Sequence, residues 1–304
     1  MISRYEHKGL RFIDIESPTK EDIRIVREEF SLHPLIAEEL TTPSLRPKVD
    51  LYKNGIYLIL HFPAFKHAHG KDTRQEVDFV IGKDYLITVH YDMIDAIHKF
   101  SKEFEVSSIL DKSEIGNHAG YLFFHLIKNL YYSLSHELEH IEARLEKAES
   151  KIFKGGEAKM VEALSYINRD LLDLKQSLRT HKDVLKSLES AGEQFFGNDF
   201  SYYLQAISGE FYKVSNTLDG HKETLIDLRE TNDSLLTTKT GNIMKRLTFV
   251  SFTTFPPMLI ASIFGINSEY TPIMGTPYDF WIVLGIIIFA TLSIILFFHH
   301  KKWL

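Results

Sequence analysis

The stretch LTFVSFTTFPPMLIASIFG, residues 247–265, carries no charged side chain, and neither does FWIVLGIIIFATLSIILFF, residues 280–298. A helix of about 20 apolar residues crosses the roughly 30 Å hydrocarbon layer of a bilayer, and each run has nearly that length. We therefore expect two membrane-spanning helices near the C-terminal end. The alternative, a buried hairpin of a soluble protein, leaves the charges that flank both runs unexplained.

Basic residues flank the two runs on one side of the membrane only. Lys245 and Arg246 precede the first run, His299–Lys302 follow the second, and the connecting segment 266–279 contains no Lys or Arg. Short cytoplasmic segments carry the excess of Lys and Arg, so both termini are predicted to be cytoplasmic, in a multi-pass protein of the inner (plasma) membrane. The first residues show no basic segment followed by an apolar run, and no cleavable signal peptide is expected.

Polar side chains distinguish the first span from the second. The second consists mostly of Ile, Leu and Phe, whereas the first contains hydroxyls and a proline pair: Thr248, Ser251, Thr253, Thr254, Ser262 and Pro256–Pro257. Hydroxyls can bond to carbonyls that proline frees, and small polar side chains suit helix contacts or a wet lumen. The first span is therefore predicted to face protein or a pore rather than lipid. Two helices cannot enclose a path, so the pore requires an oligomer with lipid around it.

Composition excludes several other classes of function. Acidic residues outnumber basic ones 41 to 35, which disfavours a nucleic-acid partner, and the chain has no cysteine for disulfides or thiolate zinc sites. No phosphate-binding glycine loop and no nucleophile–base arrangement stands out. We expect neither an enzyme nor an ATP-driven pump, and no cofactor other than a transported and regulatory divalent cation.

The rest of the chain is predicted to be an α+β cytoplasmic body followed by a stalk. Alternating or β-rich runs predict four strands, at Leu10–Ile15, Ile56–Phe62, Val77–Ile81 and Tyr85–His90, with a hairpin turn at Gly82–Asp84 between the last two. Two short helices are expected at Ile23–Phe30 and Pro34–Leu40. The predicted domains are 1–118 (α/β), 119–198 (helical hairpin), 199–246 (stalk), 247–265 and 280–298 (spans), 266–279 (outer loop) and 299–304 (basic tail).

Heptad-like spacing defines the hairpin and the stalk. Apolar residues recur every three or four positions from Ile127 to Ile152, pause at Lys154–Gly156, and resume to Leu188, which predicts an antiparallel pair of helices before a loop near residues 192–198. A second apolar stripe, with coiled-coil spacing, runs from Leu204 to Leu235 and contains two polar residues, His221 and Asn232. Without a stop signal before the membrane, one helix is expected from about Tyr203 into the first span.

Gly265–Ile266–Asn267 follows the first span. Gly-x-Asn at a helix end is usually only a cap, because glycine adopts the left-handed conformation readily. In a symmetric oligomer the same residues can do more. Mg²⁺ prefers oxygen ligands and keeps its waters, so a ring of Asn267 amides could hold a hydrated ion without trapping it.

The context of this motif resembles the CorA family of divalent metal-ion transporters. The similar segments, in order, are His33–Leu35, Glu38–Glu39, Arg46–Val49, Met244–Thr248, Pro256, Gly265–Asn267, Glu269–Pro272 and Lys301–Leu304. The resemblance implies a funnel-shaped homopentamer with an α+β cytoplasmic domain, a long stalk helix and two C-terminal spans. It also implies passive, metal-gated movement of Mg²⁺, often with Co²⁺ or Ni²⁺.

The resemblance assigns roles by position. Asn267 would hold the hydrated metal ion with Gly265 at the outer mouth, Met244 and Leu247 would form the inner constriction, and Glu269 would attract cations. Other residues along the lumen would be Thr248, Ser251, Phe255, Met258 and Ser262. The cytosolic regulatory site is not assigned. Candidates are the acidic residues of the stalk, Asp219, Asp227, Glu230 and Asp233, but an ordinary solvated stalk face explains these acids at least as well.

Three departures from the family pattern leave alternatives open. Ile266 stands where the family usually has Met, Gly241 where Asn is common, and Phe255 where Met is common. Isoleucine also occurs in the zinc-transporting ZntB branch, so a Zn²⁺ transporter, possibly proton-coupled, is the first alternative. A non-conducting membrane sensor or scaffold is the second.

Two histidine motifs are not part of the resemblance to the CorA family. His136–His140 reads HELEH, the zinc-protease pattern, but it falls within a long amphipathic helix and no third ligand is evident. His67–His69 with Asp72 is interpreted as a polar turn. We expect no protease, and an incidental or regulatory metal site at most.

Overall fold

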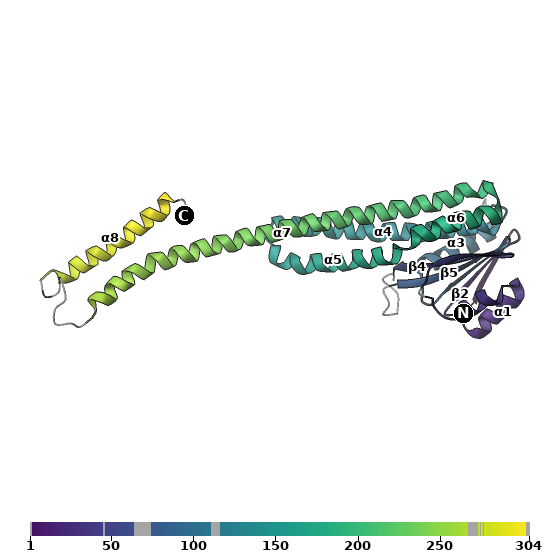
Figure 1. The fold of residues 1–304 in the computed structure, drawn as a ribbon, viewed down its shortest axis with the longest axis horizontal. Helices are drawn as coiled ribbons and strands as arrows, with labels where there is room; N and C mark the ends of the chain where they lie inside the picture. Colours follow the sequence, from purple (N-terminus) through teal and green to yellow (C-terminus); the bar gives the residue numbers. More distant parts are fainter. Residues whose placement is uncertain are drawn as a thin grey trace. The chain divides into compact units, whose positions relative to one another are not determined.

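The fold is described from a computed structural model, which covers residues 2–44, 46–63, 74–110, 116–266, 273, 275 and 277–301. The chain divides into two compact units, Met1–Arg229 and Glu230–Leu304 (Figure 1). Asn267, Glu269 and the loop with His67–His69 and Asp72 lie outside the described residues.

A six-stranded sheet lies at the centre of the first unit. Its order is β1-β2-β6-β5-β4-β3, and β2 pairs with β6 in parallel while the other neighbours are antiparallel. The strands are β1 (Ile2–His7), β2 (Leu10–Glu16), β3 (Lys48–Tyr52), β4 (Gly55–Pro63), β5 (Arg74–Ile81) and β6 (Tyr85–His90). Four of them confirm the predicted strands. The edge strands β1 and β3 were missed: β1 carries polar residues on both faces, and β3 has only five residues, of which two, Val49 and Leu51, form its apolar face.

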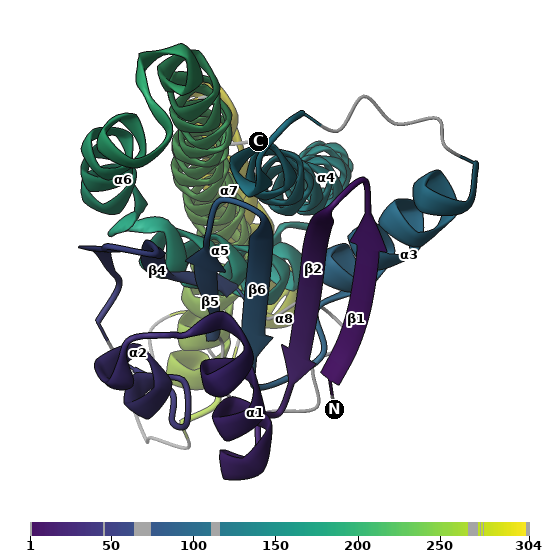
Figure 2. The ribbon, with the colours of Figure 1, turned by 90° about the vertical axis from the view of Figure 1, so that its right-hand side faces the viewer.

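Helices cover both faces of this sheet. Helices α1 (Lys20–Phe30) and α2 (Pro34–Glu39) confirm the two short helices and pack on the face of Tyr57, Val80 and Ile87. The opposite face meets α4 (Ala119–Phe153), where Phe79 and Phe123 pack edge to face at 5.4 Å between ring centroids. Figure 2 shows α1 and α2 on one side of the strands and α4 on the other. Helix α3 (Asp95–Leu110) was not predicted.

The helical part of this unit contains three helices where a two-helix hairpin was expected. The predicted turn at Lys154–Gly156 separates α4 from α5 (Glu157–Leu178), but the second arm is interrupted and continues as α6 (His181–Phe196). The loop expected from Gly192 onward is also wrong, since Gly192 lies inside α6. A Cβ at Gly192 would lie 2.5 Å from Leu204 Cδ1, so glycine permits a close approach between helices there.

His181 anchors the start of α6, directly after the break between α5 and α6. Its fully buried ring bridges two elements: Nε2 donates to the His61 carbonyl of β4 at 2.8 Å, and Nδ1 accepts from the Tyr131 hydroxyl of α4 at 2.8 Å. Burial lowers the pKa of His181 to about 4, so the imidazole is neutral at physiological pH. These two hydrogen bonds fix the first residue of α6 against both the sheet and α4.

We expect His181→Phe to destabilise the protein in a pH-dependent way. The variant keeps an aromatic ring but leaves the Tyr131 hydroxyl and the His61 carbonyl buried without their partner, which costs about 2–4 kcal/mol. The folded pKa of His181 lies below the unfolded value of 6.5, so the wild-type loses stability as pH falls from 6.5 toward about 4. A phenylalanine ring at this position cannot titrate, and the advantage of the wild-type should narrow over this range.

Thermal unfolding of the full-length protein in detergent, at about pH 7.5 and about pH 5, measures this difference. His98→Phe, at an exposed position of α3, is the matched control and should leave the midpoint unchanged. A gap between wild-type and His181→Phe that stays constant with pH would show that the neutral imidazole does not stabilise the fold.

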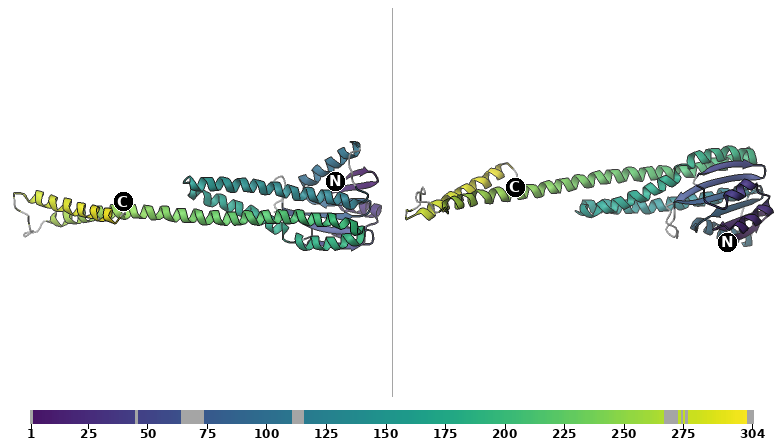
Figure 3. Two further views of the ribbon diagram at one scale, coloured as in Figure 1. Left: turned by 90° about the horizontal axis from the view of Figure 1, so that it is seen from above. Right: turned by 60° about the horizontal axis from the view of Figure 1, so that its bottom comes forward.

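Helix α7 (Ser201–Phe264) confirms the single helix expected from about Tyr203 into the first span, and Figure 3 shows it as one uninterrupted ribbon. Within the first unit its apolar stripe is buried; the members are Leu204, Ile207, Phe211, Val214, Leu218, Leu225 and Leu228. Helix α8 (Asp279–His300) corresponds to the second span. Both helices are long and apolar enough to cross a membrane.

Candidate functional site: an uncovered stripe on helix α7

Helix α8 packs against one side of α7 in the second unit. The Phe298 ring lies 5.6 Å from that of Phe249 and 6.0 Å from that of Phe252, measured between ring centroids. The partly covered positions of this part of α7 are Thr248, Phe249, Thr253, Pro256, Pro257, Ile260 and Phe264. Their spacing of mostly three or four residues defines one face of the helix, the face toward α8.

The predicted lumen residues lie on the opposite side of α7. We call Met244, Leu247, Ser251, Phe255, Met258 and Ser262 the lumen stripe; they recur every three or four residues and all are exposed. The side chains of its four large apolar members are 58–73% exposed. Since 100° per residue separates this stripe from the α8 face by about half a turn, α8 leaves it uncovered. An apolar stripe of this length needs another surface to cover it.

Thr248 lies at the edge of the lumen stripe. It is only partly exposed and lines a groove between the two helices together with Phe252, Ser293, Ile294, Phe297, Phe298 and Lys301. The structure therefore separates Thr248 from the six exposed members of the stripe.

The two prolines interrupt the hydrogen-bond ladder of α7 at mid-span. Pro256 and Pro257 have no N–H to donate to the carbonyls four residues earlier. The carbonyls that lose a donor are those of Phe252 and Thr253, but the hydroxyls of Thr253 and Thr254 do not bond to them. Thr253 Oγ1 donates to the Phe249 carbonyl at 2.8 Å, and Thr254 Oγ1 donates to the Val250 carbonyl at 2.9 Å. The ladder is therefore weakened where helices commonly bend.

Gly265 and Ile266 end α7 at the candidate outer mouth. The Gly265 N–H donates to the Ala261 carbonyl at 3.0 Å, and the Ile266 N–H donates to the Ile263 carbonyl at 3.3 Å, which tightens the last turn. Gly265 is not among the residues with positive φ, so the expected left-handed cap is wrong for this glycine. The Ile266 side chain is 62% exposed, and Asn267 begins the segment outside the described residues.

The family model described as "CorA-like Mg2+ transporter protein" matches residues 7–302. The chain belongs to this family. It is an integral membrane protein, and its family consists of divalent metal-ion transporters rather than enzymes.

Curated relatives match nearly the whole chain. The putative metal ion transporter YfjQ of Bacillus subtilis is 25% identical and is matched over 99% of this chain and 93% of its own length. The cobalt/magnesium transport protein CorA of Thermotoga maritima is 24% identical, over 93% of this chain and 80% of its own.

Solved structures confirm the expected fold class. The complete structure of the CorA magnesium transporter from Methanocaldococcus jannaschii is similar with a TM-score of 0.83 at 22% identity, over 99% of this chain and 93% of that one. The ZntB cytoplasmic domain from Vibrio parahaemolyticus is similar with a TM-score of 0.62 at 12% identity, over 77% of this chain and 90% of that one. This CorA-family chain thus combines an α/β domain, a long helix and two apolar C-terminal helices.

The stalk acids do not form a metal centre among the residues that the structure describes. Asp219 Oδ1 accepts from Lys175 Nζ at 2.7 Å, and Asp227, Glu230 and Asp233 are exposed. No group of three or more His, Asp or Glu side chains in the described part of the chain is placed to hold a metal ion. The ion pair of Asp219 favours the interpretation of an ordinary solvated stalk for that residue.

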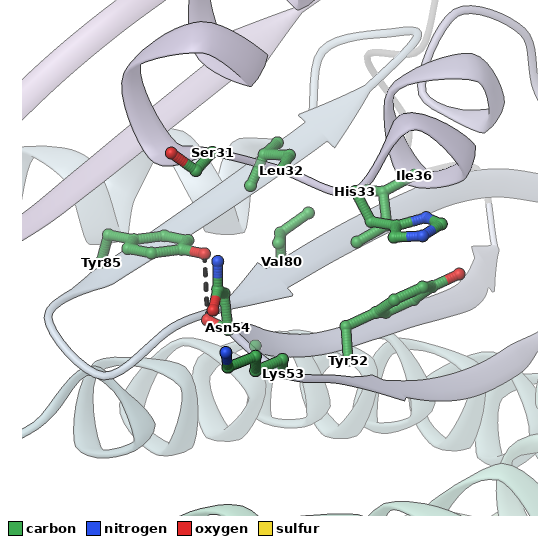
Figure 4. A pocket seen from close by; sticks show the side chains of 10 residues that line it. Ser31, Leu32, His33, Ile36, Tyr52, Lys53, Asn54, Val80 and Tyr85 are labelled. Atoms are coloured by element: carbon green, nitrogen blue, oxygen red, sulfur yellow. Dashed lines mark hydrogen bonds between the residues drawn. The ribbon is translucent and has the colours of Figure 1, made fainter.

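A small cavity of about 100 Å³ lies between the α1–α2 connection and the β3–β4 turn (Figure 4). The Tyr85 hydroxyl donates to the Asn54 carbonyl at 3.2 Å across its wall. The labelled lining includes one imidazole, from His33, and one amine, from Lys53. A single imidazole beside an amine does not make a cation site.

Asp78 is a buried titratable residue that sequence reasoning missed. It is fully buried on β5, where burial and then the nearby Glu76 carboxylate raise its pKa well above the ordinary value. The Tyr91 hydroxyl donates to Asp78 Oδ2 at 3.5 Å. Asp78 lies between the apolar residues Val77 and Phe79 of a predicted strand, and this is the signal that could have revealed it. The protonated form is favoured, which makes Asp78 a poor cation ligand.

Proposed function

We propose that this CorA-family protein conducts divalent cations, chiefly Mg²⁺ and also Co²⁺ and Ni²⁺, through a pore lined by α7 in a homopentamer. The observation that carries the proposal is the lumen stripe, an exposed and largely apolar face opposite the helix that packs on α7. Neighbouring copies of α7 would cover the sides of this stripe and leave its centre facing a lumen. The number five rests on the family resemblance.

The outer mouth is proposed to select a hydrated ion. The candidate ligands are all oxygen: the Asn267 amide, the Gly265 carbonyl and the Glu269 carboxylate. No histidine or cysteine occurs between Leu247 and Phe298. Oxygen ligands and retained water suit Mg²⁺, whereas Zn²⁺ held by protein usually takes nitrogen or sulfur.

The inner mouth is proposed to be a hydrophobic gate. Met244 and Leu247 are adjacent members of the lumen stripe and follow the segment from Thr237 to Ile243, which is exposed on all sides in one chain. Rings of apolar side chains stop ions by excluding water. Both termini are proposed to be cytoplasmic at the inner membrane, because Lys245, Arg246 and Lys301 flank the spans on that side. The cytosolic metal that closes the gate has no assigned ligands.

A second candidate is Zn²⁺ transport, possibly driven by protons. Ile266 within the motif favours it. A third candidate is a membrane sensor or scaffold, in which the protein retains the fold but its altered Gly265–Asn267 motif no longer passes ions.

Flux into liposomes that contain the purified protein tests the proposed function. We expect Mg²⁺ uptake above that of protein-free liposomes when the ion is supplied outside, without ATP. Absence of uptake for Mg²⁺, Co²⁺, Ni²⁺ and Zn²⁺ alike, in protein that is folded and inserted, would leave the sensor or scaffold.

The oligomer is testable by native mass measurement. We expect detergent-solubilised protein to have five times the mass of a single 35.2 kDa chain, because an isolated pair of spans encloses no path and exposes the lumen stripe. A stable monomer under conditions that preserve Mg²⁺ uptake would contradict the pore.

A further inference from the structure

A histidine pair on helix α4 forms a second candidate metal site, remote in sequence from the pore. His136 and His140 lie one turn apart, and both are exposed. Their ring centroids are 4.6 Å apart with an interplanar angle of 81°. Neither ring takes part in the packing of the helix, so both are open to a ligand.

The helix holds this pair on a rigid, solvent-facing side. Leu134, Leu138 and Ile141 on the other side of α4 are between 0% and 4% exposed, which fixes the rotation of the helix. Position 136 and position 140 project from the same face because residues four apart are neighbours on a helix. The backbone geometry of a two-imidazole chelate is therefore already present.

The spacing of the rings matches the needs of a transition metal. Imidazole nitrogens bind Zn²⁺ at about 2.0–2.1 Å, and at a roughly tetrahedral or right angle two such nitrogens lie about 3 Å apart. Rings whose centroids are 4.6 Å apart reach this arrangement by side-chain rotation alone. We propose that His136 and His140 together bind one borderline divalent ion, such as Ni²⁺, Cu²⁺ or Zn²⁺, on the cytoplasmic unit.

The remaining coordination positions belong to water or to Glu139. Glu139 is exposed and follows His136 by three residues, so it shares the face of the pair. The described part of the chain places no third histidine or acid in a preformed ligand set. This open coordination suits binding and not the zinc-protease chemistry that the HELEH pattern suggests, which needs a third fixed ligand.

The site discriminates against the ion that the pore is proposed to conduct. Mg²⁺ takes oxygen ligands and holds its water tightly, whereas Ni²⁺ and Cu²⁺ bind neutral imidazole well. The histidine pair would therefore make the cytoplasmic unit sensitive to transition metals in the presence of Mg²⁺. This inference holds whether or not the protein conducts Mg²⁺.

Calorimetric titration of the metal-free, full-length protein with Ni²⁺ tests the site. We expect a tight component of one Ni²⁺ per chain, separate from any weaker binding in the pore, that His136→Gln and His140→Gln each weaken by about tenfold or more, since either change removes one of two protein ligands. A large excess of Mg²⁺ should not displace Ni²⁺. His98→Gln, which removes an exposed histidine from α3, is the matched control and should leave this site intact.

The Cu²⁺ electron paramagnetic resonance spectrum gives a second readout that does not depend on affinity. Wild-type protein with one Cu²⁺ per chain should show coupling to two imidazole nitrogens, and each single variant to one. Unchanged Ni²⁺ affinity in both single variants, or displacement of Ni²⁺ by Mg²⁺, would overturn the assignment. So would a wild-type Cu²⁺ spectrum identical to that of His136→Gln.

Discussion

Asn267→Ala is expected to abolish divalent-cation uptake by the reconstituted protein, while Ile266→Met leaves it near the wild-type rate. The Asn267 amide is the proposed contact with the hydrated ion, and alanine offers no oxygen in its place. The Ile266 side chain carries no ligand atom, so exchanging it for another apolar side chain of similar volume should matter little. The measurement is the initial rate of Mg²⁺ entry into liposomes.

Ile266→Met serves as the matched control for this experiment, because it changes the neighbouring position of the same motif. Both variants must assemble as the wild-type does in a native mass measurement. Wild-type uptake by Asn267→Ala would show that selection takes place elsewhere. Loss of Mg²⁺ uptake in Ile266→Met alone would show that isoleucine, and with it the likeness to the zinc branch, defines the mouth.

Leu247→Ala and Leu247→Gly are expected to raise leak through the closed pore and to weaken inhibition by metal on the cytosolic side. Leu247 is 59% exposed on the lumen stripe, where a ring of leucines would form the narrowest apolar constriction with Met244. Shortening this side chain widens the ring and lets water enter, which removes the barrier to ions. Uptake at high internal Mg²⁺ measures the effect.

Val250→Ala is the matched control for the gate. Val250 is 54% exposed on the same helix but lies outside the lumen stripe. It should change neither leak nor inhibition. Equal leak in Leu247→Ala and the wild-type, with correct assembly, would place the constriction at another level of α7.

Elements that are determined by the burial of apolar residues, in lipid or in the protein core, were predictable from the sequence. The two uncharged runs predicted α8 and the membrane part of α7, because length and hydropathy determine which segments can enter a bilayer. The apolar stripe from Leu204 predicted the single helix α7, since no residue in it stops a helix. Apolar and β-branched runs in β4, β5 and β6 predicted the buried strands.

Features that depend on tertiary contacts were not predictable. Helix α6 begins at His181, whose ring hydrogen-bonds to Tyr131 and the His61 carbonyl, and no periodicity encodes such contacts. Gly192 read as a loop residue but lies inside α6 against Leu204. Edge strand β1 carries polar residues on both faces, and edge strand β3 is short, with only Val49 and Leu51 on its apolar face, so neither gave a distinct strand pattern.

The candidate site was predictable only in part. The family resemblance named Met244, Leu247, Ser251, Phe255, Met258 and Ser262 as lumen residues, and in the structure they form one uncovered stripe of α7. Their roles rest on family resemblance, because spacing alone cannot distinguish a lumen from a contact between copies. Thr248 fell at the edge of the stripe because α8 packs close beside it.

Competition between Mg²⁺ and Zn²⁺ in liposomes with an imposed proton gradient tests the central claim most directly. With an oxygen-only mouth, we expect Mg²⁺ to enter without a proton gradient and to reduce Zn²⁺ entry when present in excess. Zn²⁺ uptake that requires the proton gradient and is indifferent to excess Mg²⁺ would contradict the account and support the zinc transporter instead.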